Sequence, residues 1–479
     1  MTELSTLAPT SVSAPIGQRD QATMAARTGI SIESAAYLVI LAVAAVTRFW
    51  DLGARALHHD ESLHAYYSWL YATGSGYVHD SLMHGPFLFH ANALVYLLFG
   101  ATDATSRYMP ALFGIALVGL PYLLRGPRLL GRWGALLASF FLLISPSILY
   151  YSRFIRHDIY TATGALLLFI CIVRYLEYPE RRWLITGGIT TGFLFSNHEI
   201  CYAIFAIFIV FLYCAYLWER ATRAPGSVWR FAGPLIGVHV IAALSALALL
   251  VLLPKENRSR IMAIPWDVTG NDAPRPTSAN QMHYYKGLLT DPLVIGLLLI
   301  AVALVAGVIW LLSRTPREVE RPAGPVVNSV RHAWNDPNGL AVAIGAGLAI
   351  AVALFTSLFS NFLNGLATAT FATNGTFLYW LGQHDVRRGA EPWFYFLVLM
   401  PQYELIGFFI GGIAAAIMVI KALLALRPGH ADEMPSLMRL LLVAWFAGMF
   451  AVLSWAGEKM PWLVIHLALP AILLAAMIV

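Results

Sequence analysis

The sequence predicts an all-α polytopic membrane protein, and three observations support this fold class. Of the 479 residues, 59% are hydrophobic and only 12% are charged, and the mean hydropathy of +0.68 excludes an ordinary soluble domain. Apolar runs of about 20 residues recur along the chain, each long enough to cross a hydrocarbon core ~30 Å thick. These runs are continuous rather than alternating, so a transmembrane β-barrel does not fit.

The compositions of the N-terminal and C-terminal segments lead to separate predictions. Residues 1–33 are expected to form a disordered cytoplasmic N-terminus, because Ser, Thr, Ala and Pro are abundant there. The first apolar run has no small-residue cleavage site, so it should remain as an uncleaved anchor. At the other end the chain stops inside the apolar run Ala471–Val479, which leaves a truncated C-terminal module as one interpretation.

The Lys and Arg residues of the loops set the predicted orientation in a cell membrane. Cytoplasmic loops of membrane proteins are rich in Lys and Arg. The distribution of these residues along the chain favours an N-terminus in the cytoplasm, so we expect the first helix, 34–50, to run outward. The outer segment 51–106 should then hold two surface helices, 60–73 and 86–99, which are short for spans. The further predicted spans are 107–124, 133–151, 157–177, 184–197, 199–218, 231–253, 291–312, 339–360, 394–424, 438–456 and 462–479.

These spans divide into an N-terminal transmembrane module, 34–253, an outer loop, 254–290, and a C-terminal module, 291–479. The span 394–424 is long enough to be tilted, or broken near Pro401. With this orientation, several polar clusters fall at helix ends on the outer face, so we expect an outward-facing polar cavity at the membrane border.

The densest polar cluster is His58–Trp69, which follows the first apolar run. Asp60 and Glu61 start the first surface helix, where a carboxylate also serves as a helix cap. Adjacent carboxylates on a helix point in different directions, so we expect one of them to act as a general base or metal ligand, and we favour Asp60. The alternative is a solvated loop that merely caps a helix.

A second cluster, Ser152–Asp158, lies between two spans. Arg153 and Arg156 are three residues apart, so they can share a helical face and bind phosphate oxygens. Asp158 supplies a second catalytic carboxylate. An ion pair that anchors the helix at the interface is the alternative.

The triplet Asn197-His198-Glu199 is either a tight turn or part of a site. Together with Asp60 and Asp158, His198 and Glu199 could complete a divalent-cation site for Mg²⁺ or Mn²⁺. Lys459 precedes the last span, where it either snorkels or binds a lipid phosphate as a point charge.

Sugar or acceptor contacts are predicted among aromatic and polar residues of the outer segments. These candidates are His59, Tyr66, Trp69, His384 and Asp385. The same aromatics also suit an interfacial belt. No nucleic-acid motif is present, and Cys171, Cys201 and Cys214 lie in apolar runs, where they are typical of core residues.

Several of these motifs together resemble the GT-C superfamily of membrane glycosyltransferases. They are the Asp60-Glu61 pair, His84-Gly85-Pro86, Phe99-Gly100 with Arg107, Ser152-Arg153 with Asp158, and Lys459 with Pro461. Among known families, the protein O-mannosyltransferases and the aminoarabinose transferases are similar. The fuller stretches HHDESLHAYYSW and AGEKMPWLVIH resemble a prokaryotic branch described as flippase-activity-associated.

The resemblance implies an inverting glycosyltransferase that takes a sugar from a polyprenyl-phosphate carrier at the outer face. The acceptor would be a protein, a lipid or a glycan. By this resemblance Asp60 is the base, Asp158 is the second acidic residue, and Lys459, Arg153 and His84 lie near the donor phosphate.

One departure from the two named families leaves other functions open. Where those families have a lysine after their Pro-Pro element, this chain has Phe89. A non-catalytic binder of polyprenyl-phosphate sugars, or a flippase accessory protein, is therefore the main alternative. A structural subunit of a larger membrane complex is the third.

Overall fold

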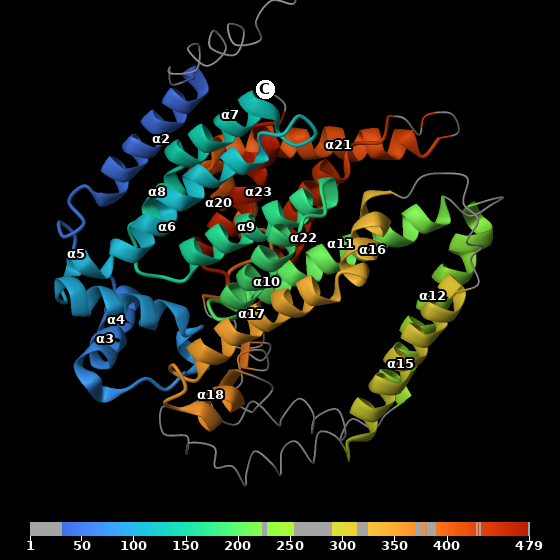
Figure 1. The fold of residues 1–479 in the computed structure, drawn as a ribbon, viewed down its shortest axis with the longest axis horizontal. Coiled ribbons are helices and arrows are strands. Elements are labelled where there is room, and N and C mark those ends of the chain that lie inside the picture. The colour runs from blue at the N-terminus through green and yellow to red at the C-terminus, as the bar shows by residue number, and fades with distance from the viewer. Residues whose placement is uncertain are drawn as a thin grey trace, which may run out of the picture.

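The structure is a computed structural model, which describes residues 31–222, 228–252, 290–313, 324–369, 376, 379–380, 389–427, 430 and 433–477. Within these residues the regular structure is entirely helical, as predicted (Figure 1). Nine of the described helical segments are long and apolar enough to span a membrane: Ile32–Phe49, Thr105–Leu124, Asp158–Glu177, Ile200–Ala221, Ala232–Leu249, Pro292–Ser313, Pro337–Phe355, Ile406–Ala425 and Leu437–Trp455. The chain is thus a multi-pass membrane protein.

The segment after the first span forms a group of short helices at one end of the bundle (Figure 1). The first span is α2 (Ile32–Phe49). The short elements that follow are α3 (His59–Leu70), the π-turn η1 (Tyr71–Ser75), the 3₁₀ turn η2 (Ser81–Met83), α4 (Phe87–Phe99) and α5 (Asp103–Ser106). Helix α3 packs against α4, and α4 contacts α6 (Tyr108–Gly119). Short helices are therefore present at both predicted positions, 60–73 and 86–99.

The middle of the chain follows the predicted spans closely, with one interruption. Its elements are η3 (Leu120–Leu124), α7 (Gly131–Ile144), α8 (Pro146–Tyr151), α9 (Asp158–Glu177), α10 (Arg181–Phe195) and α11 (Ile200–Ala221). The expected continuous span 133–151 is wrong, because Pro146 begins a new helix whose N-cap is Ser145. Proline favours the first turn of a helix but not its interior.

The last part of the chain contains α12 (Val228–Leu252), α15 (Pro292–Ser313), α16 (Pro325–Asn335), α17 (Pro337–Phe355), α18 (Phe362–Ala369), α20 (Tyr395–Tyr403), η4 (Ile406–Gly411), α21 (Gly412–Ala425), α22 (Leu437–Trp455), η6 (Pro461–Val464) and α23 (Ile465–Ala475). The span predicted over 394–424 is broken, as expected. However, Pro401 lies inside α20, and the break falls at Glu404, whose carboxylate accepts hydrogen bonds from Ser145 and Ser147.

Helix α16 was not predicted. Glu219 of α11 accepts hydrogen bonds from the backbone amides of Val326 and Val327, so a distant carboxylate caps this helix at its N-terminus.

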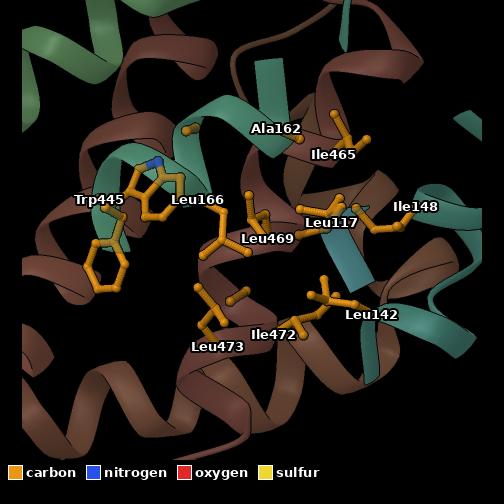
Figure 2. Packing of buried hydrophobic residues seen from close by; sticks show 14 of the residues in the cluster. Leu117, Leu142, Ile148, Ala162, Leu166, Trp445, Ile465, Leu469, Ile472 and Leu473 are labelled. Carbon is orange, nitrogen blue, oxygen red and sulfur yellow. The ribbon is translucent and has the colours of Figure 1, made fainter. Parts of the chain in front are cut away.

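Helices of both predicted modules share one hydrophobic core around α9, α22 and α23. Figure 2 shows Leu166 of α9 beside Trp445 of α22 and Leu469 and Leu473 of α23. The α9 and α23 helices are buried along most of their length. This rigid centre carries the site, because Asp158 begins α9 and His466 lies in the first turn of α23.

Helices α10 and α17 approach each other through small residues. A Cβ atom on Gly188 would lie 2.1 Å from the carbonyl oxygen of Ala343, and one on Gly192 would lie 2.1 Å from that of Gly347. Larger residues would force the backbones apart, which is why small-xxx-small patterns mark close helix pairs in membranes.

Candidate active site

Charged residues from three separate parts of the chain meet at the guanidinium of Arg156. Its Nη1 lies 2.7 Å from Oδ2 of Asp60, and its Nε lies 3.2 Å from Oδ2 of Asp158. The ring of Trp462 lies under the guanidinium, with the carbon 3.8 Å from the ring centroid. His466 Nε2 is 3.2 Å from the other oxygen of Asp158. The structure therefore brings Asp60, Asp158 and Arg156 together.

Local sequence explains how the two carboxylates reach Arg156. Asp60 lies in the first turn of α3, whose N-cap is the ring of His58 in a capping box with Glu61. Arg156 lies in the turn between α8 and α9, and Asp158 is the first residue of α9. Carboxylates are favoured in the first turn of a helix, so both positions suit an acidic side chain.

Glu61 points away from Asp60 into the protein. Arg107 donates from Nε to Oε1 at 2.8 Å and from Nη2 to Oε2 at 2.7 Å. The backbone amides of His58 and Ile155 and the guanidinium of Arg55 also donate to Glu61. Burial alone would raise the pKa of Glu61, but these donors outweigh burial and lower its pKa.

The His84-Gly85-Pro86 element docks on the turn between α10 and α11. Gly85 N donates to Asn197 O at 3.0 Å, and Phe87 N donates to Ser196 O at 3.0 Å. A Cβ atom on residue 85 would lie 2.4 Å from Ser196 O, so only glycine fits this approach. His84 has a φ of +65°, a region that non-glycine residues rarely adopt and that is often found at functional sites.

His84 forms a polar group with the predicted residues His198 and Glu199. Its Nδ1 is 2.9 Å from Glu199 Oε2, and its ring stacks on the rings of His198 and Trp380 at centroid distances of 4.4 and 4.7 Å. The ligand atoms of His84, His198 and Glu199 lie within 4.8 Å of one another. His198 Nε2 and Glu199 Oε1 are buried and make no hydrogen bond within the described residues.

Burial sets the protonation of this group. It lowers the pKa of His198 to about 3, with the nearby His84 adding to the effect, so His198 is a neutral imidazole at pH 7. Burial also raises the pKa of Glu199 to about 7, although His198 partly offsets this rise. Neutral imidazoles and a carboxylate are the donors that divalent transition metals prefer.

These groups line one wall of a cavity of about 260 Å³. Its polar wall contains Arg156, His84, His198, Glu199 and Trp380. Mainly apolar residues from the start of α11, the end of α22 and η6 line the rest: Ile200, Ala203, Val452, Leu453, Trp455 and Leu463, with Tyr202 and Glu458 among them. A cavity with charge on one side and apolar surface on the other suits an amphiphilic ligand.

Other predicted site residues lie away from this cavity. Arg153 donates to the carbonyl oxygens of Thr47 and Asp51 at the end of α2, because residues 152–157 form a turn and not the helix that we expected. Tyr66 and Trp69 are exposed and stack on each other, and His59 is exposed. His384 and Asp385 lie outside the described residues.

Lys459 is buried, and its Nζ donates to the carbonyl oxygen of Ala456 at 2.6 Å. Its neighbours Glu458 and Met460 line the cavity. This places the Lys459-x-Pro461 element beside the cavity.

Sequence reasoning assigned no role to His466, Trp462, Trp380 and His64. His466 could have been found, because a histidine inside an apolar run is costly in a membrane and marks a site. His64 lies behind the cluster, with its ring 5.1 Å from that of His157, and burial lowers its pKa well below the usual value. Trp380 reaches His84 from a distant loop, which no local pattern predicts.

Comparisons with known proteins agree with this architecture. The family described as dolichyl-phosphate-mannose-protein mannosyltransferase matches residues 83–244, which include His84, Arg156, Asp158 and Glu199. No curated protein matches the chain by sequence.

Solved structures are similar over most of the chain. ArnT from Cupriavidus metallidurans bound to undecaprenyl phosphate has a TM-score of 0.50 at 16% identity, over 92% of this chain and 59% of that chain. Archaeal AglB from Archaeoglobus fulgidus, in complex with an inhibitory peptide and a dolichol-phosphate, has a TM-score of 0.46 at 16% identity over 92% and 50%. This chain thus spans less than two thirds of the length of ArnT. Residues 83–244 thus match this mannosyltransferase family, and the fold of the chain is similar to that of ArnT, in line with the GT-C resemblance of its motifs.

Proposed function

We propose that this protein is an inverting glycosyltransferase that transfers a sugar from a polyprenyl-phosphate carrier to an acceptor at the outer face of the membrane. The observation that carries the proposal is the contact of Asp60 with Arg156, which lines an amphiphilic cavity. Arg156 supplies a permanent cation for a lipid phosphate, and the apolar wall suits an isoprenoid chain. The likeness to ArnT, whose structure holds undecaprenyl phosphate, supports a lipid-linked donor.

In this proposal Asp60 is the general base. Its carboxylate takes the proton from an acceptor hydroxyl while the hydroxyl oxygen forms a bond to the anomeric carbon of the sugar. The bond from that carbon to the phosphate oxygen breaks, and the polyprenyl phosphate leaves with the bonding electrons. Arg156 neutralises the charge that develops on the leaving phosphate. General-base assistance of this kind contributes about 10²–10⁴-fold to a rate.

The other charged residues take supporting roles in this scheme. Asp158, held by His466, positions Arg156 from the buried side. Glu61 and Arg153 act as scaffold, because their hydrogen bonds are directed to Arg107 and to backbone groups of the first outer segment. This differs from the sequence expectation, which kept Glu61 beside the favoured Asp60 as a candidate catalytic carboxylate and placed Arg153 among the phosphate ligands.

A divalent metal fits at His84, His198 and Glu199, where two buried polar atoms, His198 Nε2 and Glu199 Oε1, lack hydrogen-bond partners within the described residues. Asp60 and Asp158, which we expected to be ligands, are instead held by Arg156. Two imidazoles with one carboxylate favour Zn²⁺ over the Mg²⁺ or Mn²⁺ that we expected, because Mg²⁺ prefers oxygen ligands. A bound metal would supply positive charge near the donor phosphate.

The test of this proposal measures release of polyprenyl phosphate. Membrane vesicles containing the protein and its native acceptors are supplied with a panel of polyprenyl-phosphate sugars, and the Asp60→Asn variant is compared with Asp103→Asn. Asp103 is an exposed carboxylate near the same end of the bundle. We expect the Asp60→Asn variant to lose at least about 100-fold in rate, and Asp103→Asn to keep full activity.

Two results would contradict the proposal. Full activity of a folded Asp60→Asn protein would remove Asp60 as the base. Tight binding of the lipid-linked sugars without release, in the unmodified protein, would favour the non-catalytic binder. Sealed vesicles of the two orientations test the outer face, because only vesicles that expose the active face should use an impermeant acceptor.

A further inference from the structure

We infer that Arg156 is an exchangeable clamp: the donor phosphate and Asp60 compete for its guanidinium, so the base is released when the donor binds. This inference rests on the proposed function, and it assigns a regulation to the same site. In the structure Asp60 is not a free carboxylate but is held 2.7 Å from Nη1 of Arg156.

The two carboxylates on Arg156 are held very differently. Asp158 is fully buried and is also fixed by His466, so its contact with Nε is permanent. Asp60 keeps a quarter of its side chain exposed, and among the side chains that the structure describes its carboxylate contacts Arg156 alone. Asp60 is therefore the partner that can leave without stranding a buried charge.

Arg156 is also the group that an entering phosphate would meet. Among the described residues that line the cavity, it is the only arginine or lysine. The ring of Trp462 holds the plane of the guanidinium, while Asp158 fixes its Nε edge. The Nη1 and Nη2 groups, which contact Asp60 at 2.7 Å and His84 Nε2 at 3.5 Å, then form the edge that can make a planar two-point contact with phosphate oxygens once Asp60 leaves.

The exchange couples donor binding to chemistry. While Oδ2 of Asp60 is hydrogen-bonded to Nη1 of Arg156, that oxygen is not available to an acceptor hydroxyl. Once phosphate takes Nη1, Asp60 can accept the proton of the acceptor hydroxyl. Conversely, Arg156 cannot bind phosphate while it is paired with Asp60. The apparent affinity for phosphate is therefore reduced in proportion to the fraction of molecules in which Arg156 is unpaired.

This competition makes an unusual prediction about binding. Removing the charge of Asp60 should destroy transfer yet tighten the binding of a lipid phosphate by about three- to tenfold, because Arg156 no longer has to be released. The probe is farnesyl monophosphate, and farnesol serves as the uncharged comparison. Binding to the purified full chain in detergent is measured for the unmodified protein, Asp60→Asn and the control Asp103→Asn.

The Arg156→Gln background separates a clamp from a general field effect. A clamp predicts that Asp60→Asn no longer changes farnesyl phosphate affinity once Arg156 is removed, as a double-mutant cycle would show. Equal tightening in both backgrounds would mean that Asp60 acts only through its charge, and this would overturn the inference. The Arg156→Gln/Asp158→Asn protein, which removes the buried partner charge together with the guanidinium, provides the cycle if Arg156→Gln alone does not fold.

The remaining outcomes keep this inference distinct from the proposed function. Loss of transfer with unchanged or weaker farnesyl phosphate affinity in Asp60→Asn overturns the clamp and leaves Asp60 as the base. Tighter binding of farnesol to the same degree also overturns the clamp, since the neutral alcohol has no phosphate to compete. Retained transfer in Asp60→Asn overturns the assignment of the base, whatever the affinity.

Discussion

Asp60 and Glu61 are neighbours in sequence, and each pairs with an arginine, but the two pairs differ in nearly every physical respect. Glu61 is fully buried, and two guanidinium contacts from Arg107 at 2.7 and 2.8 Å are joined by two backbone amides. Asp60 is partly exposed and contacts Arg156 through one oxygen. The first pair is saturated with hydrogen bonds, whereas the second has unused acceptor capacity.

This difference gives two adjacent residues of one helix turn different roles: Glu61 stabilises the fold, and Asp60 is available for chemistry. Arg107 also donates to the carbonyl oxygens of Leu52 and Arg55, so the inner pair, Glu61 with Arg107, ties the segment after α2 to α6. In the outer pair, Asp60 with Arg156, the arginine lines the cavity, where a ligand can replace its partner. A carboxylate whose every lone pair is taken cannot accept a substrate proton, so the exposed member of the pair is the better candidate for the base.

The largest expected effect comes from breaking the inner pair, Glu61 with Arg107. Replacing Glu61 with Gln leaves Arg107 as a buried uncompensated charge, and this should cost about 3–5 kcal/mol of unfolding free energy. Denaturation of the protein in detergent measures the loss. Glu180→Gln, which removes an exposed partner of Arg182, should change stability by no more than about 0.5 kcal/mol. A stable Glu61→Gln protein without transfer activity would instead make Glu61 catalytic.

Acid titration sharpens the same comparison. Because the folded state lowers the pKa of Glu61 below its usual 4.5, the stabilisation is present above pH 4.5 and is lost as the pH falls through the lower folded value. Unfolding measured as the pH falls from about 6 to about 3, a range that includes the usual pKa of a glutamate, should show a smaller acid-induced loss for Glu61→Gln than for the unmodified protein. Equal losses would show that Glu61 does not carry this linkage.

A smaller change in stability is expected when the outer pair, Asp60 with Arg156, is broken. Asp60→Asn leaves Arg156 bound to Asp158, so the unfolding free energy should fall by about 1 kcal/mol or less. The same denaturation measurement in detergent compares it directly with Glu61→Gln. A loss as large as that of Glu61→Gln would mean that Asp60 is a scaffold residue too, and the distinction between the two pairs would fail.

The smallest effect should come from the exposed face of the same helix. Tyr66 and Trp69 stack on each other at a centroid distance of 6.1 Å and lie away from the cavity lining. Replacing both with Ala should alter the unfolding free energy by about 0.5 kcal/mol or less. Transfer rates should stay within a factor of about two, since surface substitutions rarely act on a distant site. A large loss of transfer with unchanged donor binding would support the predicted acceptor contact.

Hydropathy predicted most of the fold because each span must be apolar over its full length. The corrections fall where a local feature outweighs that average. Pro146 starts α8 within an apolar run, and Glu404 ends α20 by binding serines of another helix. Helix α16 escaped prediction because its cap, Glu219, comes from a segment far earlier in the chain.

The site could be predicted only in part, because charge marks candidates but not directions. Asp60, Arg156, Asp158, His198 and Glu199 do gather at one place, as the clustering of polar residues at helix ends suggested. Arg153 and Arg156 look equivalent in sequence, yet the turn between α8 and α9 directs them to different partners. Such directions depend on tertiary contacts, which spacing alone does not contain.

The glycine contact between α10 and α17 has a consequence for biogenesis. The ribosome delivers α10 long before α17, and domains assemble as their segments emerge. The close contact at Gly188 and Gly192 can therefore form only after Ala343 and Gly347 have been synthesised. The segments that contain Asp60 and Arg156 are made earlier, so this layer of the protein is completed only by a late-synthesised helix.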